Sequence, residues 1–194
     1  MAACALVVEI PVLHKAKRKE LRRIREGRPE VCEKIVCQHH ESIYRFLVYL
    51  TDGDSLAEDL TQETFASAWA SISHYKGRAS LKTWLHRIAY RKFIDSKRSL
   101  QRHTVVIDRL KQESAASVDI VNPLHRLMSD EHLRLLYEAM YKLQTSEYIV
   151  IVLHYIQGLS YREMAQVLDE SVETTKWRTS RAPKKLKTFL TGRI

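Results

Sequence analysis

The chain has 194 residues with a formal net charge of +9, and 45% of its residues are hydrophobic. This length allows one or two small domains with real cores, and the apolar content excludes a wholly disordered protein. Only 5 glycines and 4 prolines interrupt the periodic segments, so the composition predicts an all-α protein.

The predicted helices follow one another along most of the chain. They cover residues 20–26, 31–50, 56–72, 81–102, 128–143, 146–157 and 161–168, with a last helix from about residue 172. Gly27 and Gly158 are expected to end helices. Ser55–Glu58 and Ser160–Glu163 have capping-box spacing, and Ser80 is expected to cap the fourth helix.

Periodicity is lost between residues 104 and 127, where small and polar residues surround Pro123. We expect this segment to be a flexible linker between two small helical domains, residues 20–103 and residues 128–194. Residues 1–19 are predicted to form a flexible arm and are assigned no function.

The charges are unevenly distributed along the chain. Residues 1–28 contain eight basic and three acidic residues, and the chain after Glu173 has seven basic residues and no acid. Residues 46–75 contain five acids and no Lys or Arg, whereas residues 76–102 contain nine basic residues and only Asp95 as an acid. This pattern indicates a polyanionic partner and a second, basic partner, although each block alone could be a solvated helix face.

The three cysteines show no secreted-domain pattern, which predicts reduced thiols and a cytoplasmic protein. Cys32 and Cys37 near His39 and His40 do not match the usual zinc spacings, so we expect no metal and no cofactor. No apolar run approaches the ~20 residues of a membrane span, and the charge order at the start is wrong for a signal peptide.

Residues 161–181 have the spacing of a helix-turn-helix, with Ala165 small enough for close packing of the second helix. Positions 175, 179, 182 and 186 form a stripe that is expected to face inward. The opposite side carries Lys176, Trp177, Ser180, Arg181 and Lys184, as reading of the DNA major groove requires. The alternative is a surface helix of a bundle. Pro183 is expected to kink or fray this helix beyond the reading turns.

The predicted helix over residues 81–102 places Arg87, Arg91, Arg98 and Arg102 on one face, with Leu81, Leu85 and Ile88 on the buried one. Trp69, Tyr75, Trp84, Tyr90 and Phe93 are interleaved with these charges. Basic residues beside aromatic rings suit single-stranded DNA, although each ring alone could be core. Asp59 and Glu63 form an uncompensated acidic helix face beside Gln62, which suits a basic protein partner.

Three ordered motifs carry a family resemblance that covers nearly the whole chain. The segments DLTQETFASAW, YKGRASLKTWLHRIAYRKFIDSKR and LSYREMAQVLDESVETTKWRTSRAPKKL resemble the extracytoplasmic-function sigma factors of the bacterial sigma-70 family. The resemblance implies a dissociable subunit of RNA polymerase that starts transcription, with promoter DNA and core polymerase as partners. An anti-sigma factor would be a further partner.

The resemblance also implies a role for individual residues. Core-polymerase docking would fall to Asp59, Leu60, Gln62, Glu63 and Phe65. The −10 promoter element would be melted and read by the stretch from Tyr75 to Arg98, through Tyr75, Arg87, Tyr90, Arg91, Lys92 and Arg98. The −35 element would be read by Thr174, Lys176, Trp177, Arg178, Ser180 and Arg181. Arg91, Gln144, Thr175, Thr179 and Pro183 depart from the usual family residues.

No nucleophile–base set, HExxH motif or phosphate-binding glycine loop is found, so the sequence does not predict an enzyme. Two other functions remain open. A polymerase-independent repressor or activator would use the same helix-turn-helix but would have no need of the acidic face. A membrane-surface or RNA-binding basic protein would bind without sequence preference.

Overall fold

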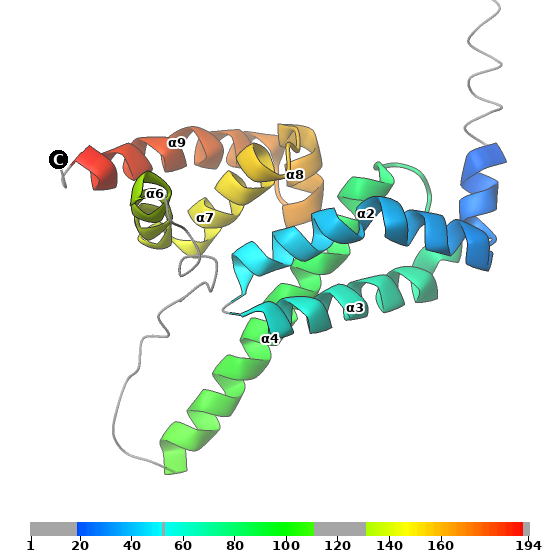
Figure 1. Cartoon of the computed structure of the whole chain (residues 1–194), viewed down its shortest axis with the longest axis horizontal. Helices are drawn as coiled ribbons and strands as arrows, with labels where there is room; N and C mark the ends of the chain where they lie inside the picture. Colours follow the sequence, from blue (N-terminus) through cyan, green and yellow to red (C-terminus); the bar gives the residue numbers. More distant parts are fainter. Residues whose placement is uncertain (1–18, 52, 111–130, 192–194) are drawn as a thin grey trace, which may run out of the picture.

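The computed structural model describes residues 19–51, 53–110 and 131–191, and throughout these ranges the regular structure is helical (Figure 1). A first helix covers residues 19–25. The elements that follow are α2 (Pro29–Leu50), α3 (Asp54–Ser71), a 3-10 turn (Ile72–His74), α4 (Leu81–Leu110), α6 (Glu131–Tyr141), α7 (Thr145–Ile151), a π-helical turn (Val152–Ile156), α8 (Tyr161–Leu168) and α9 (Val172–Thr191). The predicted all-α class is confirmed.

The first three long helices, α2, α3 and α4, form one packed bundle. Phe46 and Leu47 of α2 and Leu85 of α4 are fully buried at its centre, and Leu60 and Phe65 of α3 are buried beside them. These residues recur at helical spacing in the sequence, and burying this apolar stripe is what stabilises each helix against its neighbours. Beyond α2 and α3, the carboxyl-terminal part of α4 extends away from the bundle (Figure 1).

Helix ends follow the sequence signals only in part. Gly27 has a φ of +60°, as a helix-ending glycine requires, and Ser80 Oγ accepts a hydrogen bond from the Thr83 N–H (3.1 Å) at the start of α4. The predicted Ser55 cap is wrong, because α3 begins at Asp54, two residues before its predicted start, and has Gly53 at its N-cap without a side-chain bond.

Helix α4 also outlasts its predicted end. It continues to Leu110, so residues 104–110 of the predicted linker are helical. The rest of that segment, residues 111–127, lies outside the described residues, as do residues 1–18 of the predicted arm. Over the part of the chain that is described, no helix is long and apolar enough to cross a membrane.

Helices α6 to α9 form the second bundle, and Leu153 and Met164 are fully buried in it. Its last helix, α9, contains Pro183 and yet runs on to Thr191, so the predicted fraying at the proline is wrong. Two packing contacts hold α9 on either side of Pro183. Ala182 is fully buried, and Lys185 forms an ion pair with the buried carboxylate of Glu147 in α7.

The first bundle depends on its central apolar contacts more than on any surface group. Leu85→Ala should lower the free energy of unfolding by about 2–5 kcal/mol, because the fully buried side chain leaves a cavity. Leu56→Ala is the matched control, since that side chain is 42% exposed and should cost less than about 1 kcal/mol. Urea unfolding monitored by circular dichroism measures both, and equal losses would contradict this assignment of the core.

Candidate nucleic-acid interface

The helix-turn-helix is formed by α8 and α9, and a capping box begins it as predicted. Ser160 Oγ accepts a hydrogen bond from the Glu163 N–H (3.4 Å), while the Glu163 carboxylate accepts from the N–H (3.0 Å) and the hydroxyl (2.7 Å) of Ser160. The two bonds that the carboxylate accepts hold the pKa of Glu163 below its usual value. Asp169 ends α8 in the left-handed conformation, with a φ of 59°.

The two sides of α9 divide as the sequence predicts. Thr175, Thr179 and Ala182 are buried, and the threonine hydroxyls donate to carboxylate or carbonyl oxygens. The opposite side carries five residues: Lys176, Trp177, Ser180, Arg181 and Lys184. The Arg181 guanidinium lies 5.1 Å from the centre of the Trp177 ring, which is 59% exposed. This face therefore presents cations and an aromatic ring to solvent, as a DNA-reading helix does.

Arg178 differs from the other residues predicted to read the −35 element. Its guanidinium forms an ion pair with Glu170, and Glu170 also accepts a hydrogen bond from the Thr175 hydroxyl (2.8 Å). Both partners of the ion pair are largely buried. Arg178 thus holds the turn of the helix-turn-helix against α9, whereas Thr174, Lys176, Trp177, Ser180 and Arg181 remain exposed.

The basic face of α4 is in contact with this same turn. Arg87 Nη2 lies 2.9 Å from Asp169 Oδ1, and Arg91 Nη2 lies 3.7 Å from Asp169 Oδ2. Tyr90, which comes between these two arginines in the sequence, is half-buried. Burial raises the pKa of its hydroxyl, and the negative charge of Glu170 raises it further. The turn between α8 and α9 contains Asp169 and Glu170, and we call it the acidic turn. It pairs with Arg87 and Arg91 and acts on Tyr90 through the charge of Glu170, so its acids lie close to three residues that the sequence assigns to the −10 element.

Three predicted site residues are buried in the first bundle and are not available as surface contacts. Tyr75 is only 7% exposed; its hydroxyl donates to the Ala79 carbonyl (2.6 Å), and its ring centre lies 5.1 Å from that of Trp84. Leu60 and Phe65 are buried in the bundle core. They can position neighbouring residues, but the expectation that they themselves contact a partner does not fit their burial.

The acidic face of α3 is exposed, but it is not uncompensated as the sequence suggested. Asp59, Gln62 and Glu63 all face solvent. Glu63 pairs with Lys92 of α4 at 3.2 Å, so Lys92, predicted to contact DNA, and Glu63, predicted to contact polymerase, neutralise each other here. Arg98 lies 4.0 Å from Asp95 on α4 itself.

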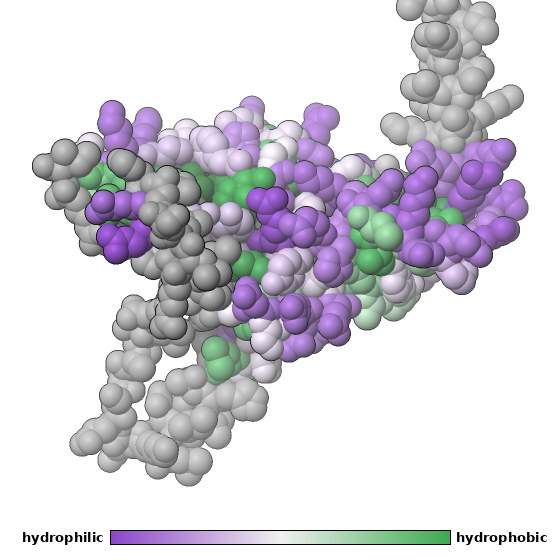
Figure 2. Space-filling view, in the orientation of Figure 1, coloured by the Kyte–Doolittle hydropathy of each residue, from purple (hydrophilic) through white to green (hydrophobic). Residues whose placement is uncertain are grey.

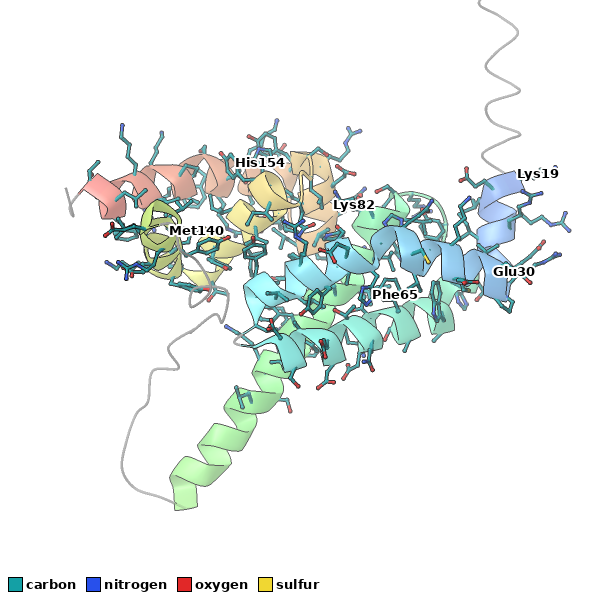
Figure 3. The ribbon with its side chains drawn as sticks, in the orientation of Figure 1. Lys19, Glu30, Phe65, Lys82, Met140 and His154 are labelled. Atoms are coloured by element: carbon teal, nitrogen blue, oxygen red, sulfur yellow. The ribbon has the colours of Figure 1, made fainter. Side chains whose placement is uncertain are left out.

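The two bundles meet along α4 and the end of α2. Thr83 donates its hydroxyl hydrogen to Glu163 (3.0 Å), Lys82 donates to the Gln157 carbonyl, and Ser42 donates to the Gln157 side chain (2.9 Å). Figure 3 places Lys82 between α2 and the helix-turn-helix. No sequence motif signalled these contacts, because they join residues 75 or more positions apart.

Aromatic side chains form a second zone of contact between the bundles. The rings of Tyr49 and Tyr137 stack at 6.1 Å, with their hydroxyls 3.0 Å apart, and the Tyr148 hydroxyl donates to the Tyr49 carbonyl (2.7 Å). Burial raises the pKa of Tyr137 and Tyr148, so both rings stay neutral. Together the two zones hold the basic face of α4 against the helix-turn-helix.

His86 lies beneath this junction and is fully buried. Its Nδ1 lies 2.8 Å from the Lys82 carbonyl, its Nε2 has no hydrogen-bond partner, and its ring packs on Phe46 at 5.1 Å. Burial lowers the pKa of His86 to about 4, and the charges of Lys82 and His39 act in the same direction. His86 is therefore neutral in the packed structure.

No group of three metal-ligating side chains gathers among the described residues. Cys32, considered with Cys37, His39 and His40 as a metal candidate, donates its thiol hydrogen to the Gly27 carbonyl (3.5 Å). Burial raises the pKa of this thiol, which favours its protonated form.

Comparison with known proteins places the chain among bacterial transcription factors. The family model "Sigma-70 region 2" matches residues 35–103, and "Sigma-70, region 4" matches residues 133–186. RNA polymerase sigma factor YlaC of Bacillus subtilis is 29% identical over 163 residues, covering 82% of this chain and 91% of that protein. ECF RNA polymerase sigma factor SigE of Mycolicibacterium smegmatis is 30% identical over 160 residues, covering 81% and 61%.

A solved structure supports the same assignment. The sigma factor RpoE of Bartonella quintana, crystallised with the anti-sigma factor NepR, matches with a TM-score of 0.66 and 26% identity. The match covers 82% of this chain and 96% of that one. The first helix, residues 19–25, and the turn at Gly27 precede the segment matched by the region 2 model.

The burial of His86 predicts a pH-dependent stability. The unfolded chain should protonate this histidine near pH 6.5, whereas the folded chain resists protonation until about pH 4. The free energy of unfolding should therefore fall as the pH is lowered from 6.5 to 4, by up to about 3 kcal/mol. His86→Gln should flatten this dependence in urea titrations, and His74→Gln, at an exposed position, should not. An unchanged slope in His86→Gln would contradict the prediction.

Proposed function

Because the chain belongs to the extracytoplasmic-function group of the sigma-70 family, we propose that it gives core RNA polymerase its promoter specificity. It would bind the polymerase and read the −10 and −35 elements of promoters, acting in the cytoplasm. The observation that carries this proposal is the presence on one chain of two separate DNA-suited faces, on α4 and α9, and an exposed acidic face on α3.

We assign −35 reading to the exposed side of α9. Lys176 and Arg181 can reach guanine acceptors or phosphates, and Trp177 offers an apolar edge to thymine methyl groups. The cation–π contact between Arg181 and Trp177 restrains both long side chains before DNA binds, which lowers the entropy lost on binding. Arg178 supports the reading face through Glu170 and is not part of it in this proposal.

We assign −10 recognition to the face of α4 that carries Arg87, Tyr90 and Arg91, with Lys92 and Arg98 beside it. The two arginines can hold phosphates of a separated strand, and the half-buried Tyr90 ring can stack on a base. Tyr75 stabilises the loop that precedes α4, because its hydroxyl donates a hydrogen bond to the Ala79 carbonyl.

Core-polymerase docking is assigned to the exposed polar residues of α3, namely Asp59, Gln62 and Glu63. Leu60 and Phe65 fix this helix in the bundle from the opposite side, so the acidic residues face outward. Acidic side chains in such a position favour a basic partner surface and repel DNA, and the Glu63–Lys92 ion pair lies where the polymerase-facing side of region 2 meets its DNA-facing side.

The packed arrangement of the two bundles requires an opening step in this function. Asp169 occupies the positions around Arg87 and Arg91 that phosphates of a −10 strand would take. We propose that regions 2 and 4 separate before DNA binds. A partner that holds them together would keep the factor inactive, and this is the role proposed for an anti-sigma factor.

The sigma function is tested by reconstitution with core polymerase. The chain should co-purify with core and direct initiation at a defined set of promoters. Asp59→Lys with Glu63→Lys should weaken core binding at least tenfold, about 1.4 kcal/mol or more, because reversed charges would face a basic surface. Binding of labelled protein to core, measured by fluorescence anisotropy, provides the readout.

Glu33→Lys with Glu131→Lys makes the same change in charge at exposed positions of α2 and α6, and should bind core normally. If the wild-type chain failed to bind core yet still bound one DNA sequence selectively, a polymerase-independent regulator would replace the sigma proposal. If the Asp59→Lys/Glu63→Lys variant bound core as tightly as the control variant, the assignment of the docking face would be refuted, but the sigma function would not.

The opening step predicts a state-dependent effect of Asp169. Asp169→Asn removes the charge while keeping a residue that tolerates the left-handed conformation. Since exposed ion pairs are worth about 0.2–1 kcal/mol, the free chain should bind a −10 single strand about twofold to fivefold more tightly. The holoenzyme, already open, should bind with unchanged affinity. Asp95→Asn serves as the control on α4, and no gain in the free chain would contradict the proposed masking.

A further inference from the structure

A cluster of exposed basic side chains lies at the far end of the first bundle from α9. Its residues from the first helix have no assigned role, and its two loop residues fall within the stretch from Tyr75 to Arg98 but are not among the side chains assigned to the −10 element. Its members come from the first helix and from the loop between α3 and α4. We name this set the amino-terminal basic surface: Lys19, Arg22, Arg23, Arg25, Lys76 and Arg78. Figure 3 places Lys19 at this end of the molecule, and Figure 2 shows hydrophilic side chains gathered there.

The first helix is fixed on the loop by specific contacts, so the basic residues of the two segments form one surface. Arg25 Nε donates to the Ser73 carbonyl (2.8 Å), and Ile24 is buried in the bundle core. The Leu21 side chain lies 3.1 Å from where a Cβ on Gly77 would sit, and Gly77 has a φ of +67°. Only glycine allows this close approach in this conformation.

Much of the charge on this surface is not neutralised. Glu26 is shared between Arg22 and Arg28, at 3.2 Å from each, and Glu20 is the other acid of the first helix. Among the described residues, Lys19, Arg23, Lys76 and Arg78 take part in no ion pair. Fixed, unpaired and exposed cations attract a polyanion and gain from counterion release when it binds.

The position of this surface indicates which polyanion it meets. Lys76 and Arg78 belong to the loop that leads directly into α4, whose arginines we assign to the −10 element. Resting on that proposed function, we propose that the amino-terminal basic surface binds phosphates of the promoter strand next to the −10 element, without reading bases. The first helix thereby extends the DNA track of region 2 beyond its family-defined segment.

The charge of the neighbouring docking face argues for DNA over polymerase as this partner. The α3 residues assigned to polymerase include the acids Asp59 and Glu63, with the neutral Gln62 beside them, and they call for a basic surface on the polymerase. Six basic side chains would be repelled by a surface of that sign. A phosphate backbone can pair with the amino-terminal basic surface while the acidic residues of α3 bind the polymerase.

The test uses holoenzyme assembled from core polymerase and the full chain. Lys19→Ala with Arg23→Ala removes two unpaired cations and leaves the acidic docking face unchanged. Affinity for a promoter fragment with a single-stranded −10 region is measured over a series of salt concentrations. The variant should bind several-fold more weakly. The slope of log affinity against log salt should fall by about 0.7–0.9 for each phosphate that the variant no longer neutralises. The −10 sequence preference should not change.

Lys34→Ala with Lys142→Ala is the matched control, since it removes two exposed positive charges elsewhere and should keep the wild-type affinity and slope. A variant that matched this control would overturn the proposal. A loss of core binding with normal DNA binding would overturn it too, in favour of a polymerase contact. Both outcomes leave the sigma function intact, whereas failure of wild-type holoenzyme to form or to bind promoter DNA would refute the proposed function itself.

Discussion

The carboxylate of Glu163 joins the two halves of this protein. One of its oxygens accepts the Ser160 bonds that begin α8, and the other accepts the hydroxyl of Thr83, next to the cap of α4. The start of the helix-turn-helix is therefore also its attachment point on region 2. Because α8 is a rigid helix that ends at Asp169, this attachment determines which groups the acidic turn meets, namely Arg87 and Arg91.

The arginines of α4 can thus pair with either of two anionic partners, the acidic turn of region 4 or the phosphates of DNA. The pairs of Arg87 and Arg91 with Asp169 are partly exposed, whereas the tyrosine stack at the end of α2 and a buried apolar cluster that continues from one bundle into the other also hold the packed form. The exposed ion pairs are individually weak, so phosphates of bound DNA can replace them.

Local sequence signals predicted the local structure well. The Ser160–Glu163 box, the turn at Gly158 and the inward stripe of Thr175, Thr179 and Ala182 depend on neighbouring residues in one helix, and the structure confirms them. The Glu63–Lys92 pair, the Arg178–Glu170 pair and the burial of Tyr75 depend on tertiary neighbours. Helical periodicity says which side of a helix is polar, but not which distant side chain will meet it.

The central claim is that the chain is a two-part promoter reader that opens on polymerase. It is tested most directly by energy transfer between dyes at Lys34→Cys in α2 of the first bundle and Lys142→Cys in region 4, with the three native cysteines replaced by serine. The account predicts high transfer in the free chain and a clear fall when core polymerase is added. Unchanged transfer in a complex that initiates transcription would contradict it.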